Sequence, residues 1–171
     1  MEKRKEAYLS QGDIVRLVEV YSDMLLRIAL NRVKSMVAAE DVVQTVFEKL
    51  MEKRPRFTSP EHEKAWLIRT AINLCLSDLR AQSRHRQEPL DENLAVSLGE
   101  ETFEVLSAVQ ALPVPDRYAV YLYYYEGYAI KEIARMLGEP EGTVAARLSR
   151  ARKKLKRLLE GGDYGQIQQR L

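Results

Sequence analysis

Seven basic side chains and no acidic one lie between residues 147 and 157. Basic residues in such a run neutralise phosphate groups, and this neutralisation supplies much of a protein's affinity for DNA. Apolar residues repeat through the same segment at spacings of four and three, which predicts a helix with one buried stripe. The apolar stripe comprises Val144, Leu148, Ala151, Leu155 and Leu158, and a second, basic stripe comprises Arg147, Arg150, Lys154 and Arg157. We therefore expect a helix that packs on one side and presents cations to DNA on another.

The alternative is that the basic run is only a solvated helix end, where cations interact favourably with the helix dipole. The residues before it favour DNA binding. Residues 129–138 predict a short helix that stops at Gly138, and Pro140 fits the first turn of the next helix. Two helices joined by a tight turn, with the small Ala134 where they cross, form a helix-turn-helix, whose second helix enters the major groove.

The composition excludes several other classes of protein. The 171 residues include one cysteine, Cys75, so an internal disulfide is impossible. His62 and His85 are isolated, and the chain has no glycine-rich phosphate loop or nucleophile–base pair, so we expect no enzyme activity, cofactor or metal. No apolar run approaches the roughly 20 residues that span a bilayer, and residues 1–5 lead into no secretory signal. We expect a cytoplasmic protein with no membrane insertion of its own.

Helical periodicity without strand signals predicts an all-α chain of two small helical domains. The first domain, at residues 10–84, is a helical bundle. Its helices are expected near residues 13–33, 38–53 and 61–82. Asp13 is the expected N-cap of the first helix.

The second domain is expected at residues 102–160, after an acidic and weakly periodic linker at 85–101. Its four helices are expected near residues 103–111, 116–125, 130–137 and 140–160. Six tyrosines lie between residues 118 and 128, and we expect most of them in the core or at interfaces. A polar tail follows at residues 161–171.

Three blocks of this sequence, in order and at the right separations, resemble the extracytoplasmic-function class of the sigma-70 family. Residues 39–47 (AEDVVQTVF) look like region 2.2, and residues 66–73 (WLIRTAIN) are similar to regions 2.3 and 2.4. Residues 112–152, with the motifs LP, YYEGY, EIA, GTV and LSRAR, resemble region 4. The resemblance implies a sigma factor, which binds RNA polymerase core enzyme and directs promoter-specific transcription initiation.

The resemblance also implies roles for individual residues. Contact with the core polymerase is assigned to Glu40, Asp41 and Gln44. Recognition and opening of the minus-10 element of promoter DNA is assigned to the loop at 56–63 and the following helix, with candidates Thr58, Ser59, Glu61, His62, Trp66, Arg69 and Asn73. Recognition of the minus-35 element is assigned to Thr143, Arg147, Arg150 and Lys154. An anti-sigma factor is a further partner that the family implies.

Other interpretations remain open. Asp41 is an ordinary exposed helix acid in one of them, and Trp66 is only a core anchor in another. Ala145 and Ala146 stand where relatives often carry polar or basic readers, so the minus-35 sequence is not transferred. For the whole chain, the alternative is a DNA-binding regulator whose N-terminal helices sense a signal or dimerise. Such a regulator binds a promoter alone, whereas a sigma factor usually needs the core enzyme.

Overall fold

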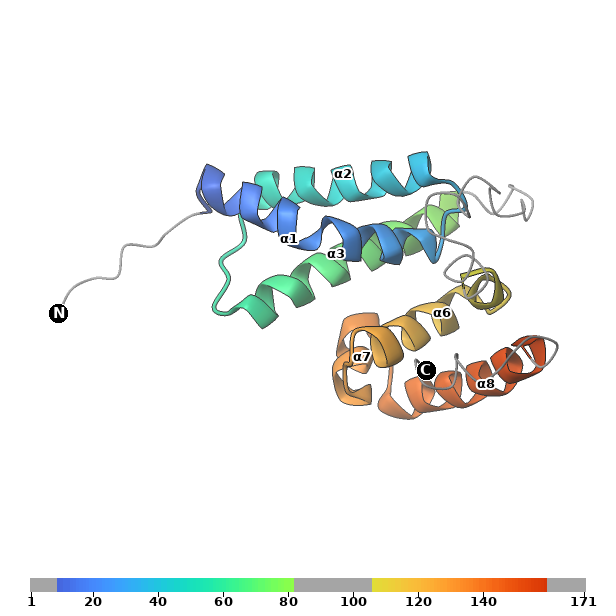
Figure 1. Ribbon diagram of the computed structural model, residues 1–171. Helices are drawn as coiled ribbons and strands as arrows, with labels where there is room; N and C mark the ends of the chain where they lie inside the picture. Colours follow the sequence, from blue (N-terminus) through green and yellow to red (C-terminus); the bar gives the residue numbers. More distant parts are fainter. Residues whose placement is uncertain (1–8, 82–105, 160–171) are drawn as a thin grey trace.

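The computed structural model describes residues 9–81 and 106–159, and all regular secondary structure within these ranges is helical (Figure 1). A short helical stretch at 106–110 precedes α6. The other elements, in chain order, are α1 (Gln11–Leu30), α2 (Met36–Lys53), α3 (Pro60–Ala81), α6 (Val114–Val120), the π-helical turn η1 (Tyr121–Tyr125), α7 (Ile130–Leu137) and α8 (Glu141–Leu159). The predicted linker at 85–101, the tail at 161–171, His85 and the domain limits at 84 and 160 lie outside the described residues.

Helix α1 begins earlier than the sequence predicted, and its N-cap is Ser10, not Asp13. The hydroxyl of Ser10 accepts a hydrogen bond from the Asp13 N–H at 3.1 Å, and the Asp13 carboxylate accepts one from the Ser10 N–H at 2.9 Å. These reciprocal bonds form a capping box, with Asp13 at its third helical position. They also lower the pKa of Asp13. The prediction of Asp13 as the cap was wrong because serine three residues earlier satisfies the same free N–H groups.

The connection between α2 and α3 is shorter than predicted. Helix α2 ends where Arg54 adopts a left-handed conformation, with φ 41°. The hydroxyl of Ser59 accepts the His62 N–H at 3.2 Å and so caps α3, which begins at Pro60. The second half of the loop predicted at 56–63 is therefore the first turn of α3. This geometry fixes the direction in which those side chains point.

Helices α1, α2 and α3 form a bundle around an apolar core (Figure 1). Each helix contributes large aliphatic side chains that are fully buried. This is the pattern of amphipathic helices whose apolar faces meet in a common core. These include Leu17, Leu25 and Ile28 of α1, Val46 and Leu50 of α2, and Leu67, Ile68 and Ile72 of α3. The bundle thus holds α2 and α3 rigidly enough to present their outer faces.

The second helical group is built on α6, which continues directly into the π-helical turn η1. Gly127 then takes a positive φ of 75° and turns the chain toward α7, and Gly138, with φ 67°, ends α7 as predicted. Tyr118 and Tyr121 are buried, whereas Tyr123 and Tyr125 are exposed. The tyrosine-rich segment is therefore core on one side and surface on the other.

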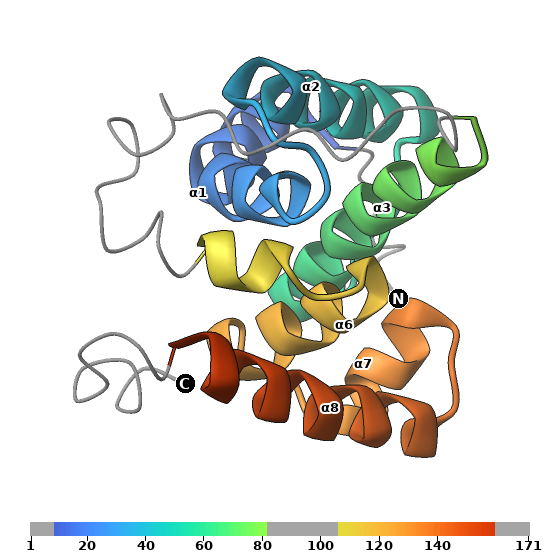
Figure 2. The same cartoon turned by 90° about the vertical axis from the view of Figure 1, so that its right-hand side faces the viewer.

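The two helical groups pack against each other, with α6 between α3 and α8 in both views (Figures 1 and 2). Tyr118 of α6 is fully buried in the same apolar cluster as Cys75 of α3. The guanidinium of Arg117 donates to the carbonyl of Asn31 at 2.7 Å, and the Gln110 amide donates to the carbonyl of Leu30. The larger of the two apolar clusters in the described residues thus runs through both helical groups.

Candidate nucleic-acid interface

Helix α8 is the second helix of a helix-turn-helix with α7. Four members of its predicted apolar stripe, Val144, Leu148, Ala151 and Leu155, are buried, with at most 4% of each residue exposed. The fifth, Leu158, is 48% exposed, so the buried stripe ends one turn earlier than predicted. The opposite face of α8 is therefore free to approach a ligand along at least three turns.

Arg147, a predicted base-reading residue, is occupied within the protein. Its guanidinium donates to both carboxylate oxygens of Glu139, at 2.8 and 2.7 Å, and to Asp116 at 2.9 Å. Asp116 is 4% exposed. The hydrogen bonds with Glu139 raise the pKa of Arg147. This cluster joins α8 to the turn before it and to α6, so it fixes the angle at which α8 leaves the domain.

Lys154, like Arg147, is held by a bond within the protein, whereas Arg150 is exposed. The ammonium of Lys154 donates to the carbonyl of Ala111 at 2.6 Å, so it lies against the segment before α6. The side chain of Arg150 is 62% exposed and reaches Asp116 only at 4.0 Å. DNA contact by Arg147 and Lys154 stays a prediction, and it requires that the two side chains break these hydrogen bonds. The exposed Arg150 can reach DNA without breaking a hydrogen bond of this kind.

The outward face of α8 carries two residues that the sequence predicted, Thr143 and Arg150, and others that it did not select. Ala145, Ala146, Arg150 and Lys153 are exposed, and Thr143 in the first turn is partly exposed. Ala146, Arg150 and Lys153 lie opposite the buried stripe, and Thr143 and Ala145 lie on its two flanks. Arg147 and Lys154 lie on the flank that meets α6 and the segment before it. A helical projection centred on Val144 and Leu148 identifies the outward face, so the signal was present in the sequence.

A second polar surface lies where the chain enters α3. The imidazole of His62 lies 3.2 Å from the Thr58 hydroxyl and 3.3 Å from the Thr58 amide nitrogen. The Phe57 ring makes edge contacts with His62 and with Trp66, at centroid distances of 5.6 and 6.0 Å. Ser59 serves as the helix cap. The structure thus gathers these predicted residues around one aromatic cluster.

Three further predicted residues follow along α3. Trp66, Arg69 and Asn73 are spaced by three and four residues, so they share one face of the helix. Arg69 and Asn73 are exposed, and Trp66 is partly buried against the core. Glu61 is exposed in the first turn of α3. The partly buried position of Trp66 is compatible with both interpretations of its role.

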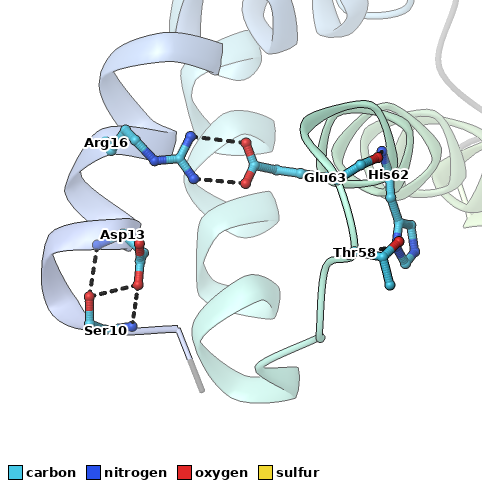
Figure 3. A network of polar contacts seen from close by, with 7 residues as sticks. Ser10, Asp13, Arg16, Thr58, His62 and Glu63 are labelled. Carbon is cyan, nitrogen blue, oxygen red and sulfur yellow. Dashed lines mark hydrogen bonds and ion pairs between the residues drawn. The ribbon is translucent and has the colours of Figure 1, made fainter. Parts of the chain in front are cut away.

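Glu63 is buried, and its carboxylate joins the start of α3 to α1. It accepts two hydrogen bonds from the guanidinium of Arg16 on α1, at 3.0 and 2.7 Å. Figure 3 shows this bidentate pair, with His62 and Thr58 pointing to the other side of the α3 backbone. The hydrogen bonds with Glu63 raise the pKa of Arg16. The pair therefore aligns the start of α3 without using the groups that line the outer surface.

The candidates for polymerase contact lie on α2, and this helix is on the side of the bundle away from α6, α7 and α8 (Figure 1). Glu40, Asp41 and Gln44 are all exposed. The Gln44 amide donates to the Glu48 carboxylate at 2.9 Å, which extends the acidic surface by one turn. The structure brings the three residues together on one helix face.

Within residues 9–81 and 106–159, no cluster of His, Cys, Asp and Glu is placed to hold a metal ion. None of the helices in those ranges combines the length and apolar character needed to cross a membrane.

A helical bundle packed on a helix-turn-helix unit, with a cationic outward face on α8, defines a DNA-binding protein. Comparison with known families is more specific. Residues 17–85 match Sigma-70 region 2, and residues 102–155 match Sigma-70, region 4. The chain belongs to the extracytoplasmic-function sigma factors of the sigma-70 family, which direct transcription initiation.

Individual relatives agree with this assignment. The chain is 35% identical over 139 residues to the ECF RNA polymerase sigma factor SigM of Mycobacterium tuberculosis, covering 79% of this chain and 71% of SigM. It is 26% identical over 153 residues to the RNA polymerase sigma factor SigV of Bacillus subtilis, covering 87% and 92% of the two chains.

Solved structures confirm the predicted all-α fold with two helical domains. CnrH, solved in complex with the cytosolic domain of CnrY, superposes with a TM-score of 0.68 at 26% identity, over 90% of this chain and 92% of CnrH. The sigma factor RpoE of Bartonella quintana, in complex with the anti-sigma factor NepR, gives a TM-score of 0.69 at 24% identity, over 87% and 98%. The second likeness supports the fold alone.

Proposed function

We propose that this sigma factor divides its work among three surfaces. The face of α2 with Glu40, Asp41 and Gln44 binds the core polymerase. The start of α3 binds and opens the minus-10 element, and the outward face of α8 reads the minus-35 element. The protein acts in the cytoplasm and contributes binding, without catalysis, a metal or a cofactor. We assign the first domain to residues 10–84 and the second to 102–160.

The observation that carries this proposal is the outward face of α8. A recognition helix contacts base edges through residues near its N-terminus. Ala145 and Ala146 are exposed in the first two turns, with Thr143 before them and Arg150 after them. Alanine suits contact with a thymine methyl group, and arginine suits the two acceptors of guanine. The face therefore fits base recognition in the major groove.

Arg150→Ala tests base recognition. We expect this change to weaken binding of the holoenzyme to its promoter by about 1–3 kcal/mol and to relax the preference at one base pair of the minus-35 element. Lys156→Ala, at an exposed position nearer the end of α8, is the comparison: a phosphate contact loses affinity evenly and lowers the salt slope. Binding to a minus-35 library measures both. Equal losses on every sequence would show that α8 only clamps phosphates.

Trp66→Ala tests promoter opening. A base leaves the stack only at a cost of a few kcal/mol, and stacking on an aromatic ring returns about 1–3 kcal/mol per base. We expect Trp66→Ala to slow open-complex formation more than it weakens the closed complex, and Trp66→Phe to restore most of the rate. Permanganate reactivity of unpaired thymines follows the opening. Full opening by Trp66→Ala would make Trp66 a core residue only.

We also propose control by an anti-sigma factor. The B. quintana relative is solved in complex with one. The same fold is present here, so we expect this chain to be bound by an anti-sigma factor as well.

Footprinting separates the proposal from a DNA-binding regulator. We assign core polymerase and DNA to separate faces of the chain, so we expect protection of a promoter only when core polymerase is added. Equal protection by the chain alone would favour the regulator.

A further inference from the structure

The polar side chains at the start of α3 are bonded to one another. The Ser59 hydroxyl accepts the His62 N–H at 3.2 Å. Hydrogen bonds from the Glu61 backbone N–H and from the Ser59 hydroxyl lower the pKa of Glu61. Thr58 lies against the imidazole of His62 with both its hydroxyl and its backbone N–H. Thr58, Ser59 and Glu61 therefore already have hydrogen-bond partners within the protein.

The backbone N–H of Thr58 determines the tautomer of His62. The Thr58 nitrogen lies 3.3 Å from Nδ1 of the imidazole, and a backbone N–H can only donate, so Nδ1 is the acceptor and carries no proton. The Thr58 hydroxyl lies 3.2 Å from the same nitrogen and can donate to it as well. In a neutral imidazole, the bond made by one ring nitrogen decides which nitrogen is protonated. The proton of His62 therefore lies on Nε2.

The ring of His62 is also held in one direction. Its edge contact with Phe57, with 5.6 Å between centroids and 85° between planes, supports the ring from the side. Figure 3 shows the imidazole beside Thr58, on the side of the α3 backbone away from Glu63. His62 is exposed, and its Nε2 has no hydrogen-bond partner in the described part of the chain. The Nε2–H is thus an oriented donor that is open to a ligand.

An unpaired base fits this donor. A base that leaves the stack exposes acceptors on its pairing edge, which are carbonyl oxygens or unprotonated ring nitrogens. Trp66 lies four residues after His62, on the same face of α3, and its ring contacts Phe57 as the imidazole does. The two residues together offer an edge contact and an aromatic surface to one nucleotide. A phosphate is a poorer ligand here, because the neighbouring carboxylate of Glu61 repels it.

We infer that His62 is the base-reading residue at the start of α3, and that it donates from Nε2–H to an acceptor atom of one unpaired minus-10 base. Thr58 and Ser59 are positioning residues that hold the imidazole in this tautomer and direction. The inference rests on the proposed function of α3. It assigns base recognition to one of the four polar residues of this segment, because the other three are bonded internally.

His62→Phe tests the contact in the holoenzyme. The change keeps a ring beside Phe57 and removes the donor. Binding is measured to promoter fragments whose minus-10 element is unpaired and randomised one position at a time. We expect the preference at one position to fall by about fivefold, the effect of one hydrogen bond, and the other minus-10 and minus-35 preferences to stay unchanged. An even loss on all sequences, or no change at any position, would overturn the inference.

Two further variants separate a donor from an acceptor at residue 62. Lysine can only donate hydrogen bonds, and an ionised glutamate can only accept them. We expect His62→Lys to keep more of the wild-type preference at the affected position than His62→Glu does. The ratio between bases is compared, because a change of net charge alters affinity for every sequence alike. Equal retention, or better retention by His62→Glu, would overturn the donor role.

Nitrogen-15 NMR of histidine-labelled protein reads the tautomer without DNA. The sequence has two histidines, and the spectrum of His62→Phe identifies the signals of His62. At mildly alkaline pH we expect the proton on Nε2, and a proton on Nδ1 would overturn the inference. The proposed function of α3 fails separately, if wild-type holoenzyme has no base preference at any minus-10 position. Preferences that survive His62→Phe remove only the role of His62.

Discussion

Replacing Arg147 with alanine is expected to lower the free energy of unfolding by about 3 kcal/mol, the lower end of the range for removing one partner of a buried ion pair. The change leaves the carboxylate of Asp116, 4% exposed, without its 2.9 Å partner. It also removes both hydrogen bonds to Glu139. Arg150, 4.0 Å from Asp116, replaces the lost charge only in part. Urea denaturation of the full chain measures the loss.

Arg150→Ala is the matched control, because it removes the same side chain from an exposed position three residues later. Its stability should stay within about 0.5 kcal/mol of wild type. Arg147→Lys keeps the charge but not the forked geometry, so it should recover only part of the stability. If Arg147→Ala kept full stability while abolishing minus-35 preference, Arg147 would be a base reader as the sequence first indicated.

Reversing the charge of Asp41 with lysine is expected to cost about 2–5 kcal/mol in binding to the core polymerase, or about 30-fold or more in affinity. Asp41 is exposed on α2, so the isolated fold should lose no more than about 0.5 kcal/mol. Affinity falls because Asp41, which is expected to pair with a cation of the polymerase, is replaced by a lysine that repels that cation. A pull-down titration against purified core enzyme measures the affinity.

Glu52→Lys is the control for this change. Glu52 is also exposed on α2 but lies in its last turn, three turns beyond Asp41. The same change of charge there should leave affinity for the core enzyme nearly unchanged. Unchanged affinity for Asp41→Lys as well would remove Asp41 from the interface and return it to an ordinary helix acid.

The helices and the helix-turn-helix were predictable because they depend on local spacing. Apolar residues at spacings of three and four, with glycine and proline at the ends, predict α7 and most of α8. Asp13 was misassigned because serine and aspartate suit the cap equally well, and only the geometry shows which residue comes first. The π-helical turn at 121–125 has no spacing signal of its own.

The long-range contacts were not predictable. Arg147 and Arg150 have the same charge and lie on one predicted stripe, yet only Arg147 meets Asp116 and Glu139 closely. That difference depends on where α6 packs, which single-sequence periodicity does not report. The ion pair between Lys64 and Glu126 joins two predicted domains and was likewise not predictable.

In vitro transcription with purified bacterial core polymerase and a library of genomic promoter fragments tests the central claim most directly. Adding this chain should produce transcripts from a defined subset of fragments that share a minus-10 and a minus-35 sequence, and omitting it should abolish them. Transcription that is unchanged by the chain, from the same fragments and at the same rate, would contradict its role as the promoter-specificity subunit.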